Sequence, residues 1–508
     1  MIGGRLFARI QGLHGWRADL CALGLGAVSA AALPPFHLVP ILLLAVPGLL
    51  ALIEGTRGAG GAFRRGFLFG LGHHIVGLYW ITEAILLESA RYWWLVPFAV
   101  PALSALLALF IAAPCAVAKR AEPGWRRVAA LAGAWVLFDL ARQYVGTGFP
   151  WNPWGSVWAF PGVAGDVMLQ PLAWIGTPGL TLATLLLAGA AMLSARGALL
   201  SAAALLVWAG LGWKRVSEPA APSPGIDAVI VQGNVKQGQK WDSGAAAEAF
   251  DRQLALTRAG VAEAGDHKSV VVWPETSTFY LLQYDPAARA ALADAARPAV
   301  AALVGGLTFD ERPTAANLAN NAPRNSLIGL GPTGDITAIY SKWHLVPFGE
   351  YAPSWVPLAI KIVPGTLAFG TGPSTLTVPG LPPFGPLICY EAVFPAQVVD
   401  EGTRPRWIVN ITNDAWFGNS TGPRQHLAAA RMRAVEEGLP LVRSANTGIS
   451  VVFDARGHEE GRLGIGVAGT LVLPIPGARP ATSFSRWGLV IPGVLSAVWL
   501  VLGLRRRR

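Results

Sequence analysis

The sequence has few charged residues and few cysteines. Only 14% of its 508 residues are charged, against about 25% in an average soluble domain. Together with 53% hydrophobic residues, this shortage excludes an ordinary soluble enzyme and a disordered chain. Its 3 cysteines, Cys21, Cys115 and Cys389, are too few and too widely spaced for a disulfide framework. Glycine and proline follow no fixed period, which excludes a collagen-like chain.

The net charge of +10 does not indicate a nucleic-acid-binding protein. The basic residues lie at the ends of apolar stretches, which is typical of membrane proteins. The sequence contains no phosphate-binding loop, no dinucleotide-binding glycine motif and no cysteine–histidine cluster with zinc spacing. We therefore expect a membrane protein that binds no nucleic acid, no metal and no cofactor.

Eight apolar stretches have about the length of a membrane-spanning helix, which needs about 20 mostly apolar residues. They lie at 15–33, 37–54, 63–83, 92–118, 127–145, 167–193, 198–213 and 487–504. We predict a seven-helix transmembrane domain over 1–216 and a last transmembrane helix within 484–508. The first stretch also resembles a cleaved signal peptide, but the six spans that follow it favour an uncleaved helix.

Lysines and arginines are concentrated at alternate ends of these stretches. If the spans alternate in direction, most of the basic residues fall on one side: Arg5, Arg9, Arg17, Arg57, Arg64, Arg65, Lys119, Arg120, Arg126, Arg127, Arg196 and Arg505 to Arg508. Positively charged loops usually remain in the cytoplasm. We therefore expect both termini in the cytoplasm and the segment between the seventh and eighth spans on the outer side.

That outer segment has the pattern of an α/β domain. Residues 217–225 are rich in proline and are expected to form a linker. Over 226–475, short β-type runs alternate with helical stretches, which favours a mixed sheet with helices. Strands are expected to begin at 227, 269, 301, 326, 385 and 407, and helices to cover 243–264, 286–297 and 423–438.

Three segments of this domain carry reactive side chains beside apolar runs. Glu275 follows a strand, where burial would raise its pKa and make it a general base; a surface glutamate is the alternative. Lys342 lies among aromatic residues, where it could stabilise an oxyanion or only extend its charge to solvent. Cys389 ends a strand, which is the geometry of a nucleophile elbow; a buried structural cysteine is the alternative.

Together these segments resemble the carbon–nitrogen hydrolase (nitrilase) superfamily, whose members use Glu, Lys and Cys in this chain order. A domain of this kind between membrane spans is similar to the apolipoprotein N-acyltransferases, a membrane-bound family of the superfamily. The segments that carry this second resemblance are Lys342–Tyr351, Leu387–Glu391, Asn413–Gly418, Gly422–His426 and Arg443–Gly448.

The resemblance implies an α-helical membrane bundle of eight transmembrane helices and an α/β domain with the nitrilase-like αββα sandwich over 226–475. It places the protein in the bacterial inner membrane with the catalytic domain in the periplasm. The implied reaction moves a fatty acyl chain from a phospholipid, through a thioester on Cys389, to the amino group of the N-terminal diacylglyceryl-cysteine of an apolipoprotein. This is the last step of lipoprotein maturation.

The resemblance also implies a role for each matched residue. Cys389 is the nucleophile, Glu275 the base, and Lys342 the oxyanion-stabilising cation, helped by the backbone N–H of Tyr390. Glu350 and Glu391 orient Lys342 or share protons with it. Trp241 belongs to a loop over the pocket, and Tyr390 and Arg443 are further candidates for substrate contact. No cofactor and no metal are implied, and a monomer is expected.

Two other functions remain open from the sequence. A membrane-tethered amidase or nitrilase would share the same three residues. A transporter or assembly scaffold with an inactive domain would need paired broken helices or polar midplane sites, for which no convincing pair is evident. Within the expected spans, His73, His74 and Asp139 are candidates for proton transfer, but hydrogen bonding between helices is favoured.

Overall fold

The computed structural model describes residues 4–505 except 88, 237–242, 319 and 354–365. Its contacts divide the chain into two compact units. The first unit comprises Met1–Leu86, Ala90–Glu218 and Thr482–Arg508, and the second comprises Leu87–Ser89 and Pro219–Ala481. Each unit has hydrophobic clusters of its own.

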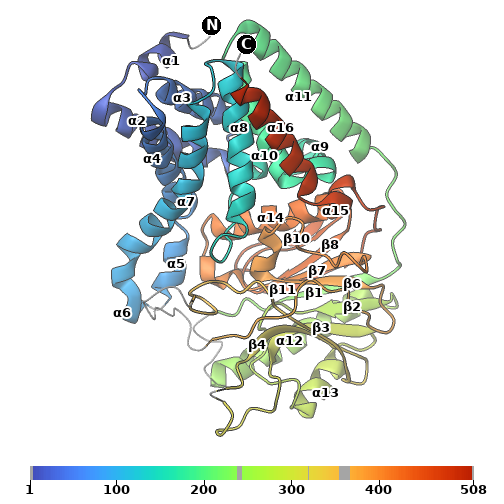
Figure 1. Cartoon of the computed structure of the whole chain (residues 1–508). Coiled ribbons are helices and arrows are strands. Elements are labelled where there is room, and N and C mark those ends of the chain that lie inside the picture. Colours follow the sequence, from blue (N-terminus) through green and yellow to red (C-terminus); the bar gives the residue numbers. More distant parts are fainter. Residues whose placement is uncertain (1–3, 88, 237–242, 319, 354–365, 506–508) are drawn as a thin grey trace. The chain divides into compact units, whose positions relative to one another are not determined.

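The first unit is helical (Figure 1), and a helix lies at each place where a span is expected. These helices are α2 (Gly15–Ser29), α3 (Leu42–Glu54), α4 (Ala59–Gly77), α7 (Val96–Ala118), α8 (Trp125–Arg142), α10 (Leu172–Ala191), α11 (Ala195–Val216) and α16 (Val490–Leu504). The shorter helices are α1 (Gly4–Gln11), α5 (Ile81–Leu86), α6 (Ser89–Tyr92), α9 (Gly162–Leu169) and α15 (Ser483–Trp487).

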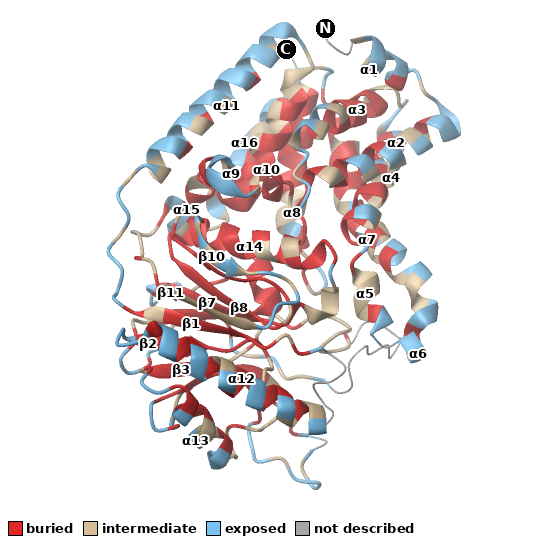
Figure 2. Ribbon diagram, turned by 180° about the vertical axis from the view of Figure 1, so that it is seen from behind, coloured by how far each residue is buried: buried red, intermediate tan, exposed pale blue. Residues whose placement is uncertain are grey.

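Several of these helices have the length and composition of membrane spans. Among the described residues, Trp93–Ala118, Leu172–Ala191 and Ala195–Val216 are long and apolar enough to cross a membrane. Val39–Glu54 and Val490–Leu504 are apolar but shorter. Figure 2 shows α11 with a mostly exposed surface, and leucines such as Leu206, 74% exposed, lie on it. Exposed apolar side chains on a long helix fit contact with lipid, while the number of eight spans stays a prediction.

Glycines allow these helices to approach one another closely. A Cβ atom on Gly26 of α2 would lie 1.9 Å from the carbonyl oxygen of Phe69 in α4. Likewise, a Cβ on Gly72 of α4 would lie 2.1 Å from the carbonyl oxygen of Leu23 in α2. Small residues at helix contacts are a common feature of membrane proteins, where tight van der Waals packing drives association.

The sixth apolar stretch is not the single continuous helix expected from the sequence. It comprises the end of α9 and the whole of α10, and α10 contains a non-helical residue, Gly176, with φ 63° and ψ 178°. Pro178 follows and has no backbone N–H to donate. A Cβ on Gly176 would lie 2.0 Å from the Phe484 ring in α15, so both the positive φ and the close contact require glycine.

The second unit contains two β-sheets. The first has the strand order β11-β1-β2-β3-β4-β5, and the second has the order β10-β9-β8-β7-β6. The strands are β1 (Asp227–Gln232), β2 (Ser269–Val272), β3 (Ala301–Thr308), β4 (Arg324–Leu330), β5 (Ile336–Ser341), β6 (Phe384–Ile388), β7 (Trp407–Thr412), β8 (Leu441–Ala445), β9 (Ser450–Phe453), β10 (Glu459–Leu463) and β11 (Gly469–Pro474).

Apolar side chains of both sheets, including Ile230, Leu303 and Val409, form a shared core between them. Helices α12 (Ser243–Ala264) and α13 (Pro286–Ala295) pack on the other face of the first sheet. Helix α14 (Gly422–Glu437) packs on the other face of the second. Most strand residues are buried, while α12 and α13 expose one face (Figure 2). The αββα layering implied by the resemblance is therefore confirmed.

Candidate active site

Cys389 lies at a sharp turn between β6 and the short 3-10 helix η6 (Cys389–Val393). Its φ of +50° is in the left-handed region, which costs a non-glycine residue about 1–3 kcal/mol and often marks a functional site. The elbow expected from the sequence is therefore present. The residue is buried at this elbow, since Cys389 is only 5% exposed.

Glu275 follows β2 by three positions, and its carboxylate is buried. Oε1 accepts hydrogen bonds from Lys342 Nζ at 3.2 Å and from Asn325 Nδ2 at 2.7 Å. Oε2 accepts a hydrogen bond from the backbone N–H of Asn413 at 2.7 Å. Three donors from three different segments thus fix the orientation of this carboxylate.

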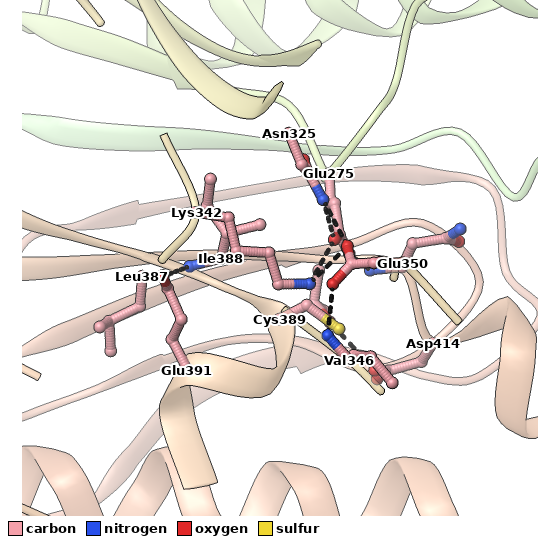
Figure 3. Close-up of polar contacts among 12 residues, drawn as sticks. Glu275, Asn325, Lys342, Val346, Glu350, Leu387, Ile388, Cys389, Glu391 and Asp414 are labelled. Carbon is pink, nitrogen blue, oxygen red and sulfur yellow. Dashed lines mark hydrogen bonds and ion pairs between the residues drawn. The ribbon is translucent and has the colours of Figure 1, made fainter. Parts of the chain in front are cut away.

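Lys342 directly follows β5 and is only 1% exposed. Its ammonium lies between two carboxylates, at 3.2 Å from Glu275 Oε1 and 2.9 Å from Glu350 Oε1 (Figure 3). Burial alone would lower the pKa of Lys342, but the two carboxylates and Cys389 raise it well above its usual value. Lys342 therefore keeps its positive charge in a site from which most water is excluded.

The Cys389 sulfur lies beside the Lys342 ammonium and the carboxylates of Glu275 and Glu350 (Figure 3). Burial raises the pKa of the Cys389 thiol, and the negative charge of Glu275 raises it further, although Lys342 acts in the opposite direction. The free thiol is therefore protonated near neutral pH. A base must remove this proton before the sulfur can attack, and the carboxylate of Glu275 lies beside the sulfur.

Glu350 and Glu391 have different surroundings. Glu350 contacts Lys342 directly, and its Oε2 accepts a hydrogen bond from the backbone N–H of Val346 at 2.7 Å. Glu391 accepts hydrogen bonds from Tyr340 Oη at 2.9 Å, from the Trp343 N–H at 2.7 Å and from the Ile388 N–H at 2.6 Å.

Glu391 therefore links residues on either side of Lys342 in the chain, Tyr340 and Trp343, to Ile388 at the end of β6. Burial raises the pKa of Glu391 to about 7, because it opposes the charged form more strongly than these donors favour it. A carboxyl group with this pKa changes its protonation near neutral pH.

The remaining three candidates have other contacts or lie outside the described residues. Tyr390 follows Cys389 and packs its ring edge-on against Phe394 at 5.1 Å. Arg443 is buried and pairs with Asp414 at 2.8 Å, so its guanidinium supports the site instead of entering it. Trp241 lies outside the described residues.

Sequence reasoning assigned no role to Asn325, Asn413, Asp414 or His426. Asn325 donates hydrogen bonds to both Glu275 and Glu350, but a single asparagine in an apolar strand gives no signal of this. The other three lie in segments that carried the family resemblance. Their contacts depend on how the two sheets pair and on the packing of α14 against η6, which the sequence does not reveal. Among the described residues, no cluster of three His, Cys, Asp or Glu side chains could hold a metal.

Comparison with known proteins first defines the class. Residues 230–468 match the carbon-nitrogen hydrolase family, and residues 25–191 match the apolipoprotein N-acyltransferase N-terminal domain. The solved structure of an amidase from Nesterenkonia sp. is 18% identical, with a TM-score of 0.37, and the alignment covers 51% of this chain and 94% of the amidase.

Full-length relatives then define the particular family. The apolipoprotein N-acyltransferase of Bradyrhizobium diazoefficiens is 37% identical, and the alignment covers 97% of this chain and 96% of that protein. That of Rhodopseudomonas palustris is 36% identical, with the same coverage of both chains. This chain belongs to the apolipoprotein N-acyltransferase family of bacterial lipoprotein-modifying acyltransferases.

Proposed function

We propose that this chain transfers a fatty acyl chain from a phospholipid to the N-terminal amino group of a diacylglyceryl-modified apolipoprotein, through a thioester on Cys389. One observation carries the proposal above all others. Glu275, Lys342 and Cys389 come from three distant segments of the chain, and the carboxylate and the ammonium lie beside the buried sulfur of Cys389. The full-length similarity to apolipoprotein N-acyltransferases supports the same substrates.

In the first half-reaction the Cys389 thiol gives its proton to Glu275, and the sulfur attacks the ester carbonyl of the phospholipid. A C–S bond forms, and the negative charge that develops on the carbonyl oxygen is stabilised by Lys342 and the backbone N–H of Tyr390. The intermediate then expels the lysophospholipid alkoxide. This oxygen takes the proton back from Glu275 and leaves as an alcohol.

In the second half-reaction the free amino group of the apolipoprotein attacks the thioester carbonyl. Glu275 accepts a proton from this amine, and the C–S bond breaks as the amide forms. The sulfur regains a proton, which restores the starting enzyme. Because an amide is more stable than a thioester, this chemistry needs no nucleotide. The burial of Cys389 supports exclusion of water, which would otherwise release the acyl chain as a free acid.

The proposed arrangement in the membrane follows from the substrates. A lipid donor and a lipid-anchored acceptor both lie in the bilayer, which explains why a nitrilase-like domain is joined to apolar helices. We assign eight spans in two segments, 1–216 and 484–508, with both termini in the cytoplasm. The linker 217–225 then leads to a periplasmic catalytic domain over 226–475, and the protein acts as a monomer.

Intact mass measurement of the purified protein after incubation with phospholipid tests the proposed intermediate. We expect an added fatty-acyl mass that hydroxylamine removes and that Cys389→Ala abolishes. Cys21→Ala is the matched control, because Cys21 is partly exposed on α2 in the helical unit and should keep the adduct. Release of ammonia from small amides without an acyl adduct would favour an amidase instead, and no reaction with either substrate would favour a transporter or scaffold.

A further inference from the structure

A buried histidine holds the carbonyl oxygen of Cys389. His426 lies in the first half of α14, and its Nε2 is 2.9 Å from the Cys389 carbonyl oxygen. Its Nδ1 is 2.9 Å from Asp414 Oδ1. Both side chains are inaccessible to solvent. Neither has a part in the proton transfers proposed above, although both lie directly behind the nucleophile.

These two contacts define where the histidine carries protons. A carbonyl oxygen can only accept a hydrogen bond, so Nε2 must carry a proton. Burial alone would raise the pKa of Asp414, but Arg443 and His426 lower it to about 2. Asp414 is therefore a carboxylate, and its Oδ1 faces Nδ1 of the same imidazole ring.

The neighbouring groups hold the imidazole ring at its other nitrogen. The Asp414 carboxylate bridges Arg443 and His426, because Oδ2 accepts a hydrogen bond from Arg443 Nη2 at 2.8 Å while Oδ1 faces His426. Arg443 Nη2 also lies 3.2 Å from His426 Nδ1, so Nδ1 contacts both members of the Asp414–Arg443 ion pair.

The rest of the surroundings is polar or aromatic. The Thr412 hydroxyl donates a hydrogen bond to Asp414 Oδ1 at 3.1 Å. The Phe417 ring lies edge-on to His426 at 6.0 Å. Arg443 also donates hydrogen bonds to Asn410 Oδ1 and to the Ile449 carbonyl, so its position does not depend on His426.

The carbonyl of Cys389 and the N–H of Tyr390 belong to one peptide group. A donor on the carbonyl oxygen draws electron density from the nitrogen, which makes the N–H a stronger hydrogen-bond donor. We propose that His426 is a positioning residue: held by Asp414, it donates from Nε2 to the Cys389 carbonyl, fixes the Cys389 elbow and polarises the peptide that stabilises the oxyanion. This inference rests on the proposed acyl transfer and assigns one new residue to it.

His426→Gln keeps a donor but removes the contact with Asp414. Glutamine can place an N–H near the Cys389 carbonyl but has no second ring nitrogen to face Asp414, and it leaves the pair of Asp414 and Arg443 intact. We expect the rate of thioester formation from phospholipid to fall about tenfold, with KM within twofold of wild type. His426→Leu removes the donor completely and should lower the rate about 100-fold, as loss of an oxyanion donor does.

Alkylation of Cys389 by iodoacetamide shows whether His426 polarises the Cys389–Tyr390 peptide or only maintains the local structure. This reaction needs the same sulfur but forms no oxyanion, so its rate should fall at least five times less than that of thioester formation. His267→Gln is the matched control: His267 also bonds an aspartate, with Nδ1 3.0 Å from Asp227 Oδ2, but its side chain is 78% exposed. We expect its rates to equal those of the wild type.

Equal losses in the two reactions, or no loss in thioester formation, would overturn the inference. Either variant is sufficient for this test if the other does not fold, which thermal unfolding would show. Failure of the wild-type protein to form any thioester would instead contradict the proposed function, so the two claims fail by different observations.

Discussion

At the scale of single residues, Lys342 determines the charge balance of the site. Its ammonium separates the carboxylates of Glu275 and Glu350, and Asn325 Nδ2 bridges the same two groups at 2.7 and 3.1 Å. Without the lysine, the buried carboxylate of Glu275 and the partly buried carboxylate of Glu350 would repel each other. Lys342 therefore has a structural effect in addition to its proposed role at the oxyanion.

Replacing this lysine should thus affect both activity and stability. In Lys342→Met we expect thioester formation to fall at least about 100-fold. The free energy of unfolding should fall by about 3–5 kcal/mol, because one partner of a buried ion pair is removed. Single-turnover mass measurements and thermal unfolding check these effects. Lys268→Met is the control, since Lys268 is exposed beside β2, and a similar loss there would contradict the account.

Glu391 should make stability depend on pH. Its pKa is raised from 4.5 to about 7, so the folded protein binds a proton more tightly than the unfolded chain. Its contribution is present below pH 4.5 and decreases as the pH rises to about 7, by up to about 3 kcal/mol. Unfolding measured at pH 5, 6 and 7 should show this decrease in the wild type and a flatter profile in Glu391→Gln. Identical slopes would contradict the pKa shift.

At the scale of elements, close backbone contacts fix the distances between the reactive groups. A Cβ on Gly305 of β3 would lie 2.2 Å from the Pro274 carbonyl oxygen, beside Glu275. The N–H of Gly370 donates to the Lys342 carbonyl at 2.7 Å, and a Cβ there would lie 1.9 Å from the Ser341 carbonyl oxygen. Side chains at these two positions would push Glu275 or Lys342 away from the sulfur.

Gly370→Ala tests this spacing. The added methyl group must displace the chain at Lys342, and we expect at least about a tenfold loss of thioester formation, because small shifts of catalytic groups have large effects on rate. Gly464→Ala is the matched control in the same unit, since nothing lies within 4 Å of a Cβ there. Wild-type activity of Gly370→Ala would show that this contact does not position Lys342.

Many of the strands and helices of the second unit could be predicted from the sequence. The six expected strands and three expected helices are present, because their apolar runs are continuous and clearly bounded. Five strands were missed, and β10 shows why: its sequence Glu-Glu-Gly-Arg-Leu has no apolar alternation. Glu275, Lys342 and Cys389 were found because each lies in a recognisable motif.

The side chains that orient those residues could not be predicted in the same way. Asn325 lies beside Lys342 only because β4 pairs with β5, and the Lys342 N–H donates to the Asn325 carbonyl at 2.8 Å. His426 contacts Cys389 because α14 packs against η6. Such contacts follow from strand register and helix packing, which local sequence patterns do not determine.

At the scale of the whole molecule, a charged residue in the first expected span has its partners within the helical unit. Asp19 of α2 pairs with Arg64 at 2.7 Å and with Arg65, both in α4. Pairing reduces the cost of a charge in an apolar helix. These arginines belong to the basic set that we assign to the cytoplasmic side.

Cysteine labelling tests this orientation. In a chain without its native cysteines, we expect Ala220→Cys, in the linker, to react with a membrane-impermeant maleimide in intact spheroplasts. Ala195→Cys, between the sixth and seventh expected spans, should react only after lysis. Both positions are exposed, so the two variants are matched. Labelling with the opposite sidedness would contradict the assigned topology.

A single-turnover transfer experiment tests the central claim most directly. Protein first loaded from a phospholipid with an isotopically labelled acyl chain is freed of lipid and then mixed with a diacylglyceryl-cysteine peptide. The account predicts that the labelled acyl group leaves Cys389 at the same rate at which the N-acylated peptide appears. Release of the label as free fatty acid, or formation of the acylated peptide while the label stays on Cys389, would contradict it.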